Sequence, residues 1–207
     1  MIFDLGRVLV RICRDWEHAC ERAGISVPAL PGSNADRQKL HELFNHAEIG
    51  AIGFDELAQQ AAPLMSLSPA QLGAVSDAFI FGPYPGATEL LKELSDAGVR
   101  TACLSNTNEH HWGLLSQAGH RAWIPLHGLD HRFASHLIRA RKPDEAIYSY
   151  VEAQTGLPGS AMLFFDDVQE NVAAAERRGW KAQWIDPELD EPIGQIRNAL
   201  RELDILR

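Results

Sequence analysis

The chain has 207 residues, of which 45% are hydrophobic and 23% are charged, and its formal net charge is −9 at pH 7. This length predicts one domain, or one domain with a small insert, and this balance is typical of a globular protein. The negative charge disfavours nucleic acids and anionic membranes as partners, because the summed field repels both. No apolar run approaches the roughly 20 residues of a membrane span.

Three cysteines show neither metal-ligand spacing nor an even disulfide set, and the histidines show no HExxH pattern. We therefore expect buried free thiols and a reducing, cytoplasmic setting. Asp4 and Arg7 interrupt the first apolar run, which is unlike a signal peptide.

That first run stops at Asp4, and Gly6 follows it. A run this short is typical of a buried strand, which places Asp4 at the carboxyl end. Open α/β sheets bind their ligands at those ends. Asp4 is therefore a candidate nucleophile or metal ligand, although Asp and Gly are also ordinary turn residues.

A helix-rich block follows, from about residue 13 to residue 84, and we identify no strand within it. A helix is predicted over 15–23, with Gly24 as its stop. Ser68 and Pro69 predict the start of another, as an N-cap followed by proline at the first helical position. The first strand is thus separated from the other strands by a helical insert.

From about residue 85 the pattern alternates between strands and helices, which predicts βαβ units and a doubly wound parallel sheet. The predicted strands are 99–104, a short strand within 123–135, 161–165 and 180–185. The predicted helices are 87–97, 111–118, one starting at Pro143, 168–178 and 192–203.

Polar residues follow three of these strands: Asp4, Ser105-Asn106 and Asp166-Asp167, and Lys142 opens a helix. In a doubly wound sheet such positions converge on one crevice. Taken singly, Ser105 is also typical of a helix cap, Lys142 of a solvated lysine and Asp166-Asp167 of a helix start. Their order, each after an apolar run, favours a common site.

The residue types in this set are chemically complementary. Clustered carboxylates repel one another unless a cation lies between them, and oxygen ligands favour Mg²⁺ over Zn²⁺. A hydroxyl, a backbone N–H and a lysine suit phosphate oxygens. Together they indicate phosphoryl transfer through an aspartyl-phosphate.

The chain resembles the haloacid dehalogenase (HAD) superfamily of hydrolases, whose four motifs occur in order. They are Phe3-Asp4-Leu5-Gly6-Arg7-Val8-Leu9, Cys103-Leu104-Ser105-Asn106-Thr107-Asn108, Arg141-Lys142-Pro143-Asp144 and Phe164-Phe165-Asp166-Asp167-Val168-Gln169-Glu170-Asn171. The first motif is similar to that of bacterial sugar-phosphate phosphatases, above all the alpha-glucose-1-phosphate phosphatase group.

The resemblance implies a Rossmann-like α/β core over residues 1–12 and 85–207, with a helical C1-type cap over 13–84. It implies that Asp4 is the nucleophile, that Ser105 and the Asn106 backbone N–H bind the phosphate, and that Lys142 neutralises its charge. It also implies that Asp4, Asp167 and the Gly6 carbonyl are Mg²⁺ ligands, and that Asp166 either binds the ion directly or contacts its ligands. The implied reaction is Mg²⁺-dependent hydrolysis of a small phosphomonoester, expected to be a sugar phosphate. We expect no nucleic-acid or membrane partner, and oligomeric state is left open.

Two positions depart from the family pattern. Many family phosphatases have an aspartate, as general acid and base, where this chain has Gly6, which predicts slow turnover or a proton from water or the cap. Relatives usually have glycine where this chain has Arg139, which we expect to point outward. His110 and His111 are candidate substitute proton donors, or structural residues.

Three other functions are alternatives to a phosphatase. A 2-haloacid dehalogenase uses the same nucleophile without metal and without the aspartate missing at Gly6, but Asp166-Asp167 is typical of Mg²⁺-dependent members. A non-catalytic module that binds phosphorylated ligands is also consistent with Gly6. A phosphomutase is disfavoured, because it needs an acid/base to return the phosphoryl group.

Overall fold

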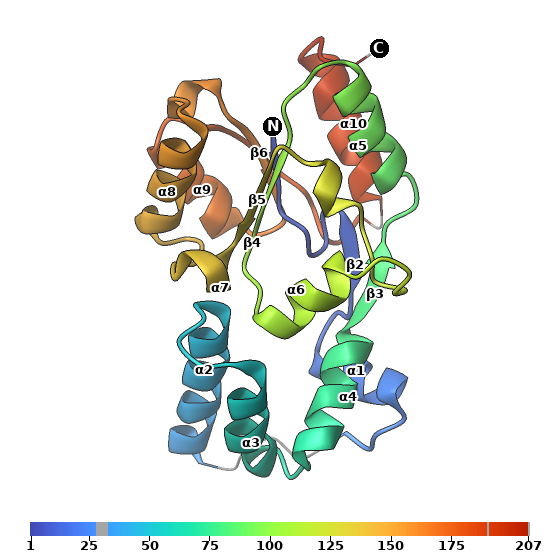
Figure 1. The fold of residues 1–207 in the computed structure, drawn as a ribbon, viewed down its shortest axis with the longest axis vertical. Coiled ribbons are helices and arrows are strands. Elements are labelled where there is room, and N and C mark those ends of the chain that lie inside the picture. Colours follow the sequence, from blue (N-terminus) through green and yellow to red (C-terminus); the bar gives the residue numbers. More distant parts are fainter. Residues whose placement is uncertain (28–32, 190, 207) are drawn as a thin grey trace.

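The computed structural model describes residues 1–27, 33–189 and 191–206, and a five-stranded parallel sheet forms the centre of its upper half (Figure 1). The strand order is β5-β4-β1-β6-β7, and all neighbouring pairs are parallel. The predicted parallel α/β fold is therefore confirmed. The strands are β1 Ile2–Phe3, β4 Ala102–Ser105, β5 His131–Ala134, β6 Leu163–Asp166 and β7 Lys181–Trp184.

Helices cover both faces of this sheet, as Figure 1 shows with α5 and α10 on one side and α8 and α9 on the other. Successive strand residues point to opposite faces. Phe3 accordingly packs in the cluster that contains α5 and α10, whereas Ile2 packs in the cluster that contains α8 and α9. The helices around the sheet are α5 Ala87–Asp96, α6 Glu109–Ser116, α7 Ser135–Ile138, α8 Glu145–Thr155, α9 Gln169–Arg177 and α10 Pro192–Glu202.

Four inserted helices form the lower half of the molecule: α1 Trp16–Ala23, α2 Asn34–Glu48, α3 Phe54–Leu64 and α4 Pro69–Phe79. The start of α4 and the end of α1 have the capping residues that the sequence predicts. Ser68 and Gln71 form a reciprocal capping box at α4, and Gly24 ends α1 in the left-handed conformation. Leu57 and Leu72 are fully buried in a cluster of apolar residues within these helices.

A two-stranded antiparallel sheet connects the two halves, formed by β2 Val10–Ile12 and β3 Ile80–Pro83. The expectation of no strand between residues 13 and 84 is therefore wrong for β3. The sequence does not indicate this strand, because it contains Gly82 and Pro83, and both residue types are rare in strands. Gly82 is required there: its φ is 133°, and a Cβ would lie 2.5 Å from the Arg121 carbonyl oxygen.

Two expectations from composition agree with the structure. Cys13, Cys20 and Cys103 are free and buried. Among the described residues, no helix has the length and apolar character needed to cross a membrane.

Candidate active site

Two adjacent strands, β1 and β6, bring three carboxylates together at the carboxyl ends of the sheet strands. β1 lies between β4 and β6, so Asp4 follows the central strand of the three, and its N–H donates to the Phe165 carbonyl at 2.8 Å. One oxygen each of Asp4, Asp166 and Asp167 lies within 4.8 Å of the others. Among the residues that the structure describes, no other group of three or more such ligands is this close.

Lys142 lies between two of these carboxylates. Its side chain is 1% exposed, and Nζ lies 2.9 Å from Asp4 Oδ1, 2.6 Å from Asp166 Oδ2 and 2.8 Å from the Leu104 carbonyl oxygen. Three acceptors therefore match the three protons of the ammonium group. The Asn106 side chain fixes the Lys142 backbone through two hydrogen bonds of 2.9 Å, one to its N–H and one to its carbonyl.

The three carboxylates carry more negative charge than the single Lys142 ammonium group can balance. Burial raises the pKa of Asp4 to about 7, and Asp166 and Asp167 add to the rise while Lys142 opposes it. Burial and Asp166 likewise raise the pKa of Asp167. Burial lowers the pKa of Lys142, but Asp4 and Asp166 outweigh it, so the lysine pKa is raised and the ammonium stays charged. A divalent cation would relieve the remaining repulsion.

The donor set fits a hard metal ion. Both oxygens of Asp166 already have partners: Oδ2 meets Lys142, and Oδ1 accepts from the Val168 N–H and the Asn171 amide, each at 2.9 Å. Asp167 has a weaker contact, since its Oδ2 lies 4.0 Å from Arg7 Nη1. Oxygens of Asp4 and Asp167 are thus the more available ligands, and oxygen ligands suit Mg²⁺.

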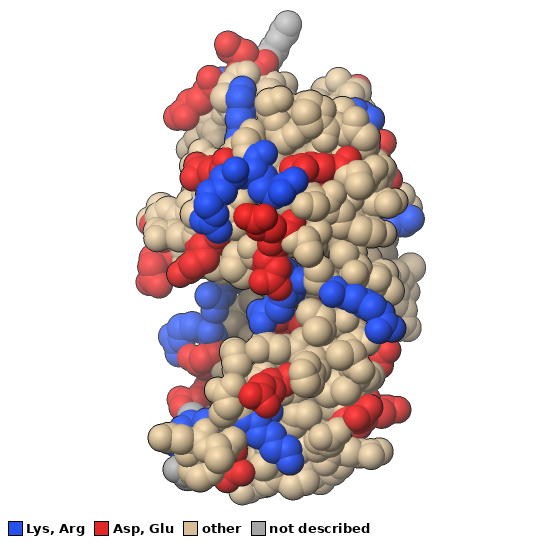
Figure 2. All heavy atoms as spheres, turned by 90° about the vertical axis from the view of Figure 1, so that its left-hand side faces the viewer, with Lys and Arg blue, Asp and Glu red and all other residues tan. Residues whose placement is uncertain are grey.

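A cavity of about 440 Å³ adjoins this cluster. Gly6, Ser105 and Asn106 line it from the sheet, and side chains of the inserted helices line it from below. Ser105 and Asn106, two of the three predicted phosphate-binding residues, thus share one cavity at the carboxyl ends of the strands, whereas Lys142 and the three carboxylates are not among its lining residues. Figure 2 shows basic side chains around a hollow at the level where the two halves meet.

Several residues of this region were not predicted from the sequence. Glu48 and Trp16 line the cavity from the inserted helices. Glu48 Oε2 lies 2.9 Å from Arg141 Nη2, in a charge contact that lacks hydrogen-bond geometry. Ser135 accepts from the Thr107 N–H at 2.9 Å and donates to the Glu48 carbonyl at 2.6 Å. The seryl hydroxyl therefore links the loop after β4 to helix α2.

His110 and His111 lie on α6 and both contact α4. His110 Nε2 lies 2.6 Å from Asp77 Oδ1, and its ring stacks on Phe54. His111 lines the cavity, and its Nε2 lies 3.1 Å from the Ser76 carbonyl and 2.9 Å from Ser76 Oγ. Burial, followed by His110, lowers the pKa of His111 to about 4, so this ring is neutral at pH 7 and a weak proton donor.

Gly6 and Arg139, the two positions that depart from the family pattern, lie in different surroundings. Gly6 lines the cavity, and a Cβ built on it would lie 3.2 Å from the tip of Ile12. Arg139 is exposed at the end of α7, as expected, and has a left-handed φ of 62°. Glycine adopts that conformation without strain, which gives a backbone reason for glycine in relatives.

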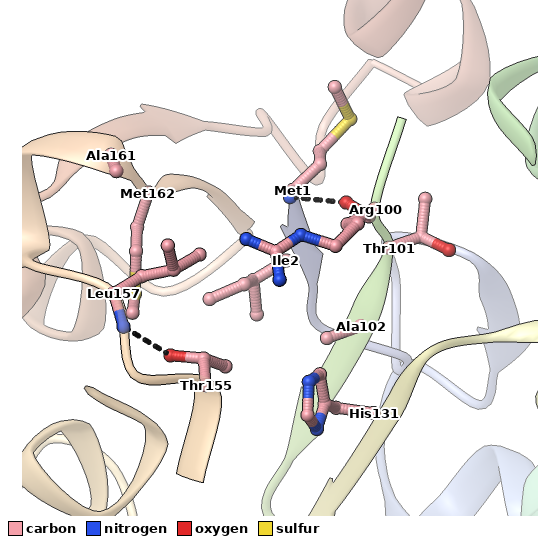
Figure 3. A pocket seen from close by; sticks show the side chains of 10 residues that line it. All are labelled: Met1, Ile2, Arg100, Thr101, Ala102, His131, Thr155, Leu157, Ala161 and Met162. Carbon is pink, nitrogen blue, oxygen red and sulfur yellow. Dashed lines mark hydrogen bonds between the residues drawn. The ribbon is translucent and has the colours of Figure 1, made fainter. Parts of the chain in front are cut away.

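A second, smaller cavity lies at the opposite ends of the strands (Figure 3). Its volume is about 30 Å³, which is enough for one or two water molecules. It is lined by Met1, Ile2, Arg100, Thr101, Ala102, His131, Thr155, Leu157, Ala161 and Met162. None of the predicted site residues is among them, so this cavity has no part in the site.

Comparisons with known proteins place this geometry in a family context. The chain is 31% identical over 163 residues to phosphoglycolate phosphatase from Pseudomonas savastanoi pv. phaseolicola, which covers 74% of the chain and 53% of that protein. It is 30% identical over 111 residues to (S)-2-haloacid dehalogenase from Pseudomonas sp. strain YL, which covers 53% of the chain and 46% of that protein. The matches thus span about half the length of these curated relatives.

A solved structure has the same fold. It is a HAD family enzyme from Bacteroides thetaiotaomicron, in complex with magnesium and inorganic phosphate, with a TM-score of 0.70 and 21% identity over 90% of this chain and 93% of that one. The family model described as haloacid dehalogenase-like hydrolase matches residues 12–179. The chain therefore belongs to the haloacid dehalogenase-like hydrolases.

Proposed function

We propose that the protein is a Mg²⁺-dependent phosphohydrolase that cleaves a small phosphomonoester through an aspartyl-phosphate on Asp4. The main support is the position of Lys142, which contacts Asp4 and Asp166 from within a cluster of three carboxylates. This arrangement leaves Asp4 next to a cation, and the two residues that follow it, Leu5 and Gly6, line the cavity. Phosphoglycolate phosphatase among the relatives agrees with this chemistry.

Asp4, Asp167 and the Gly6 carbonyl would hold the metal ion, and Asp166 would orient Lys142 from behind. Bound Mg²⁺ would supply positive charge to the phosphate and neutralise the carboxylate cluster. The magnesium complex of the Bacteroides enzyme supports this choice of ion.

In the first step, an Asp4 oxygen attacks phosphorus and the bond from phosphorus to the ester oxygen breaks. Ser105 and the Asn106 N–H hold two phosphate oxygens, and Lys142 offsets the charge that builds on the third. The leaving alcohol takes up one proton. In the second step, water attacks phosphorus, loses a proton, and releases inorganic phosphate and the free Asp4 carboxylate.

Gly6 leaves both proton transfers without a side chain at the family position. Solvent water is then the proton donor and acceptor, and the resulting turnover is slow, because a positioned acid or base typically contributes about 10²–10⁴-fold.

The proposal divides the chain into a core of residues 1–12 and 85–207 and a cap of residues 13–84, which would exclude water and select the substrate. A sugar phosphate as substrate and the likeness to the alpha-glucose-1-phosphate phosphatase group stay predictions. The apolar lining of the cavity disfavours a sugar phosphate. The proposed function also predicts that the partners are small phosphate esters and not nucleic acids, and that the setting is cytoplasmic.

The second candidate is metal-independent 2-haloacid dehalogenase activity. Identity to a dehalogenase and the absence of an acid at Gly6 favour it. Both oxygens of Asp166 have hydrogen-bond partners, whereas Asp167 has only a 4.0 Å charge contact with Arg7, and this favours the metal-dependent reaction instead.

Release of inorganic phosphate from a panel of phosphomonoesters, with Mg²⁺ or with chelator, tests the proposal. We expect metal-dependent release that Asp4→Asn abolishes while the circular dichroism spectrum is unchanged. Turnover retained in Asp4→Asn would refute the mechanism. Chloride release from a 2-haloacid without metal would establish the second candidate, and phosphate-ester binding without turnover would indicate the non-catalytic module.

A further inference from the structure

The cavity beside Ser105 has an apolar wall. The inserted helices contribute the side chains of Trp16, Leu40, Phe44, Met65 and Phe79 to it. Ile12 and Ile80, on the two connecting strands, extend this surface toward the sheet. The part of the cavity that faces away from the phosphate-binding residues is thus largely hydrocarbon and aromatic.

Most polar groups in the lining already have partners within the protein. Ser76 and His111 bind each other at 2.9 Å, and the Asn106 side chain is held by the Lys142 backbone. The Asn108 side chain accepts from the His111 N–H at 2.9 Å as the cap of α6. The Ser76, His111 and Asn106 side chains therefore contribute little free hydrogen-bonding capacity to a ligand, whereas the Asn108 amide N–H groups have no partner among the described residues.

Of the other polar side chains in the lining, Ser105 is the proposed phosphate ligand and the Thr107 hydroxyl donates to the Asn108 carbonyl at 3.3 Å. Glu48 is the single acid among the lining residues, and its charge is countered by Arg141 at 2.9 Å. The Trp16 indole N–H is buried and has no hydrogen-bond partner among the described residues. Because this nitrogen is buried, Trp16 presents its apolar ring atoms to the cavity.

This lining suits some phosphate esters and disfavours others. A sugar body has several hydroxyls, and each loses hydrogen bonds to water when it enters a wall without free partners. A hydrocarbon body gains free energy from leaving water. The cavity is continuous with Ser105 and Gly6, so the group that occupies it is the alcohol part of the ester bound at the phosphate site.

We propose that the substrate of this site is a phosphomonoester of an apolar alcohol, with a hydrocarbon or aromatic body. This inference rests on the proposed phosphohydrolase function and names its substrate class. The sugar phosphate expected from sequence resemblance would leave its hydroxyls facing Leu40, Phe44 and Phe79.

A matched pair of esters tests the substrate class. Cyclohexylmethyl phosphate and glucose 6-phosphate both release a primary alcohol from a six-membered ring, but only the sugar carries ring hydroxyls. With Mg²⁺, we expect kcat/KM to be at least about tenfold higher for the cyclohexylmethyl ester. In the series from ethyl to pentyl phosphate, kcat/KM should rise by up to about fourfold per methylene, the factor expected for a buried CH₂.

Two leucine variants test the location. Leu40 and Leu64 are both partly buried against the same apolar cluster of the inserted helices, but only Leu40 lines the cavity. We expect Leu40→Asn to lower the cyclohexylmethyl-to-glucose ratio of kcat/KM by roughly five- to tenfold, and Leu64→Asn to leave it within about twofold of wild type. The ratio is measured within one preparation, so partial unfolding cancels.

p-Nitrophenyl phosphate separates the two levels of failure. If none of these esters releases phosphate, the proposed function is wrong and the substrate class falls with it. If the nitrophenyl ester is hydrolysed but the cyclohexylmethyl ester is no better than glucose 6-phosphate, only the substrate class is overturned. An equal change of ratio in both leucine variants would overturn the location. If Leu40→Asn does not fold, the wild-type alkyl series decides alone, and a flat series refutes the inference.

Discussion

Lys142 is the residue on which the charge balance of the site depends. It is almost fully buried between Asp4 and Asp166, and its ammonium group has three acceptors within 2.9 Å. A buried charge without its partner is strongly destabilising, whereas the complete group is tolerated. The catalytic cluster and the stability of the sheet edge are therefore coupled through one side chain.

Lys142→Met should lower the free energy of unfolding by about 3–5 kcal/mol, because it leaves two buried carboxylates facing each other. Denaturant unfolding in the presence of chelator measures this. Lys39→Met is the control, since Lys39 is exposed on α2 and its change should stay within about 0.5 kcal/mol. Equal stability of the two variants would show that Lys142 does not hold the carboxylates.

Gly6→Asp should accelerate turnover, because it places a carboxyl beside the leaving group at the family position for acid/base catalysis. A gain of up to about 10²–10⁴-fold in kcat is the expected range. The Ile12 tip, 3.2 Å from the new Cβ, is the end of a flexible side chain and can shift. Gly6→Asn is the matched control, with the same shape but no titratable proton. If both variants have the same kcat, the proton-transfer account of Gly6 is wrong.

The sequence predicted the polar residues that follow the strands, because the carboxyl end of a strand can be inferred from the end of a short apolar run. Asp4, Asp166 and Asp167 were expected to lie together, and their oxygens do. Glu48, Trp16 and the Ser135 link could not be predicted. They come from inserted helices or loops whose distance from the sheet depends on tertiary packing and not on any local pattern.

At the scale of elements, α4 and α6 connect the two halves of the molecule. His110 and His111 of α6 contact Asp77 and Ser76 of α4. The two helices carry one histidine–carboxylate contact and one neutral hydrogen-bonded pair side by side. The neutral pair depends on His111 being unprotonated, since burial lowers its pKa to about 4.

His111 should make the stability of the protein depend on pH between about 6.5 and 4. In this range the unfolded histidine binds a proton and the folded one does not, so the contribution of His111 is present above pH 6.5 and is lost as the pH falls through 4. The shift corresponds to at most about 3 kcal/mol. Unfolding of wild type and His111→Gln across this range measures the loss as a difference between the two curves.

Glutamine keeps a hydrogen-bonding side chain but does not titrate, so His111→Gln should lose less stability than wild type on acidification. Two unfolding curves that stay parallel from pH 7 to pH 4 would contradict the neutral state of His111.

The elements themselves were largely predictable where a periodic apolar face coincides with a cap. Helix α10 begins at Pro192, as expected, and α1 ends at Gly24 as expected. Among the described residues, β2, β3 and α7 were not predicted. β3 contains Gly82 and Pro83 and is paired only with β2, and α7 is a single short turn after β5. Such short elements form because of their neighbours, and local propensity does not mark them.

At the scale of the whole molecule, metal binding should stabilise the fold, because the three-carboxylate site exists only when β1 and β6 are paired. Mg²⁺ at 100 times its dissociation constant should add about 2.7 kcal/mol, which corresponds to a rise of roughly 5–10 °C in Tm for a chain of this length. Asp167→Asn should remove most of the rise.

This stabilisation should be greater at pH 8 than at pH 6. The pKa of Asp4 is raised to about 7 by burial, so at pH 6 a proton must leave before the carboxylate can bind the ion. The apparent affinity for Mg²⁺ should then be about tenfold lower at pH 6 than the limit reached at high pH. Thermal unfolding with and without Mg²⁺ at both values measures it. The same Mg²⁺-dependent shift at both values would show that Asp4 is not a ligand.

The most direct test of the central claim is to look for the phosphoryl group on Asp4. The aspartyl-phosphate is the covalent intermediate between the two proposed steps, and Gly6 supplies no base for its hydrolysis. Acid quenching in the presence of Mg²⁺ and substrate, followed by mass spectrometry of the peptides, should show one added phosphoryl group on the peptide that contains Asp4. The adduct should be absent from Asp4→Asn and from samples with chelator. Steady release of phosphate with no modified Asp4 peptide at any quench time would contradict the account.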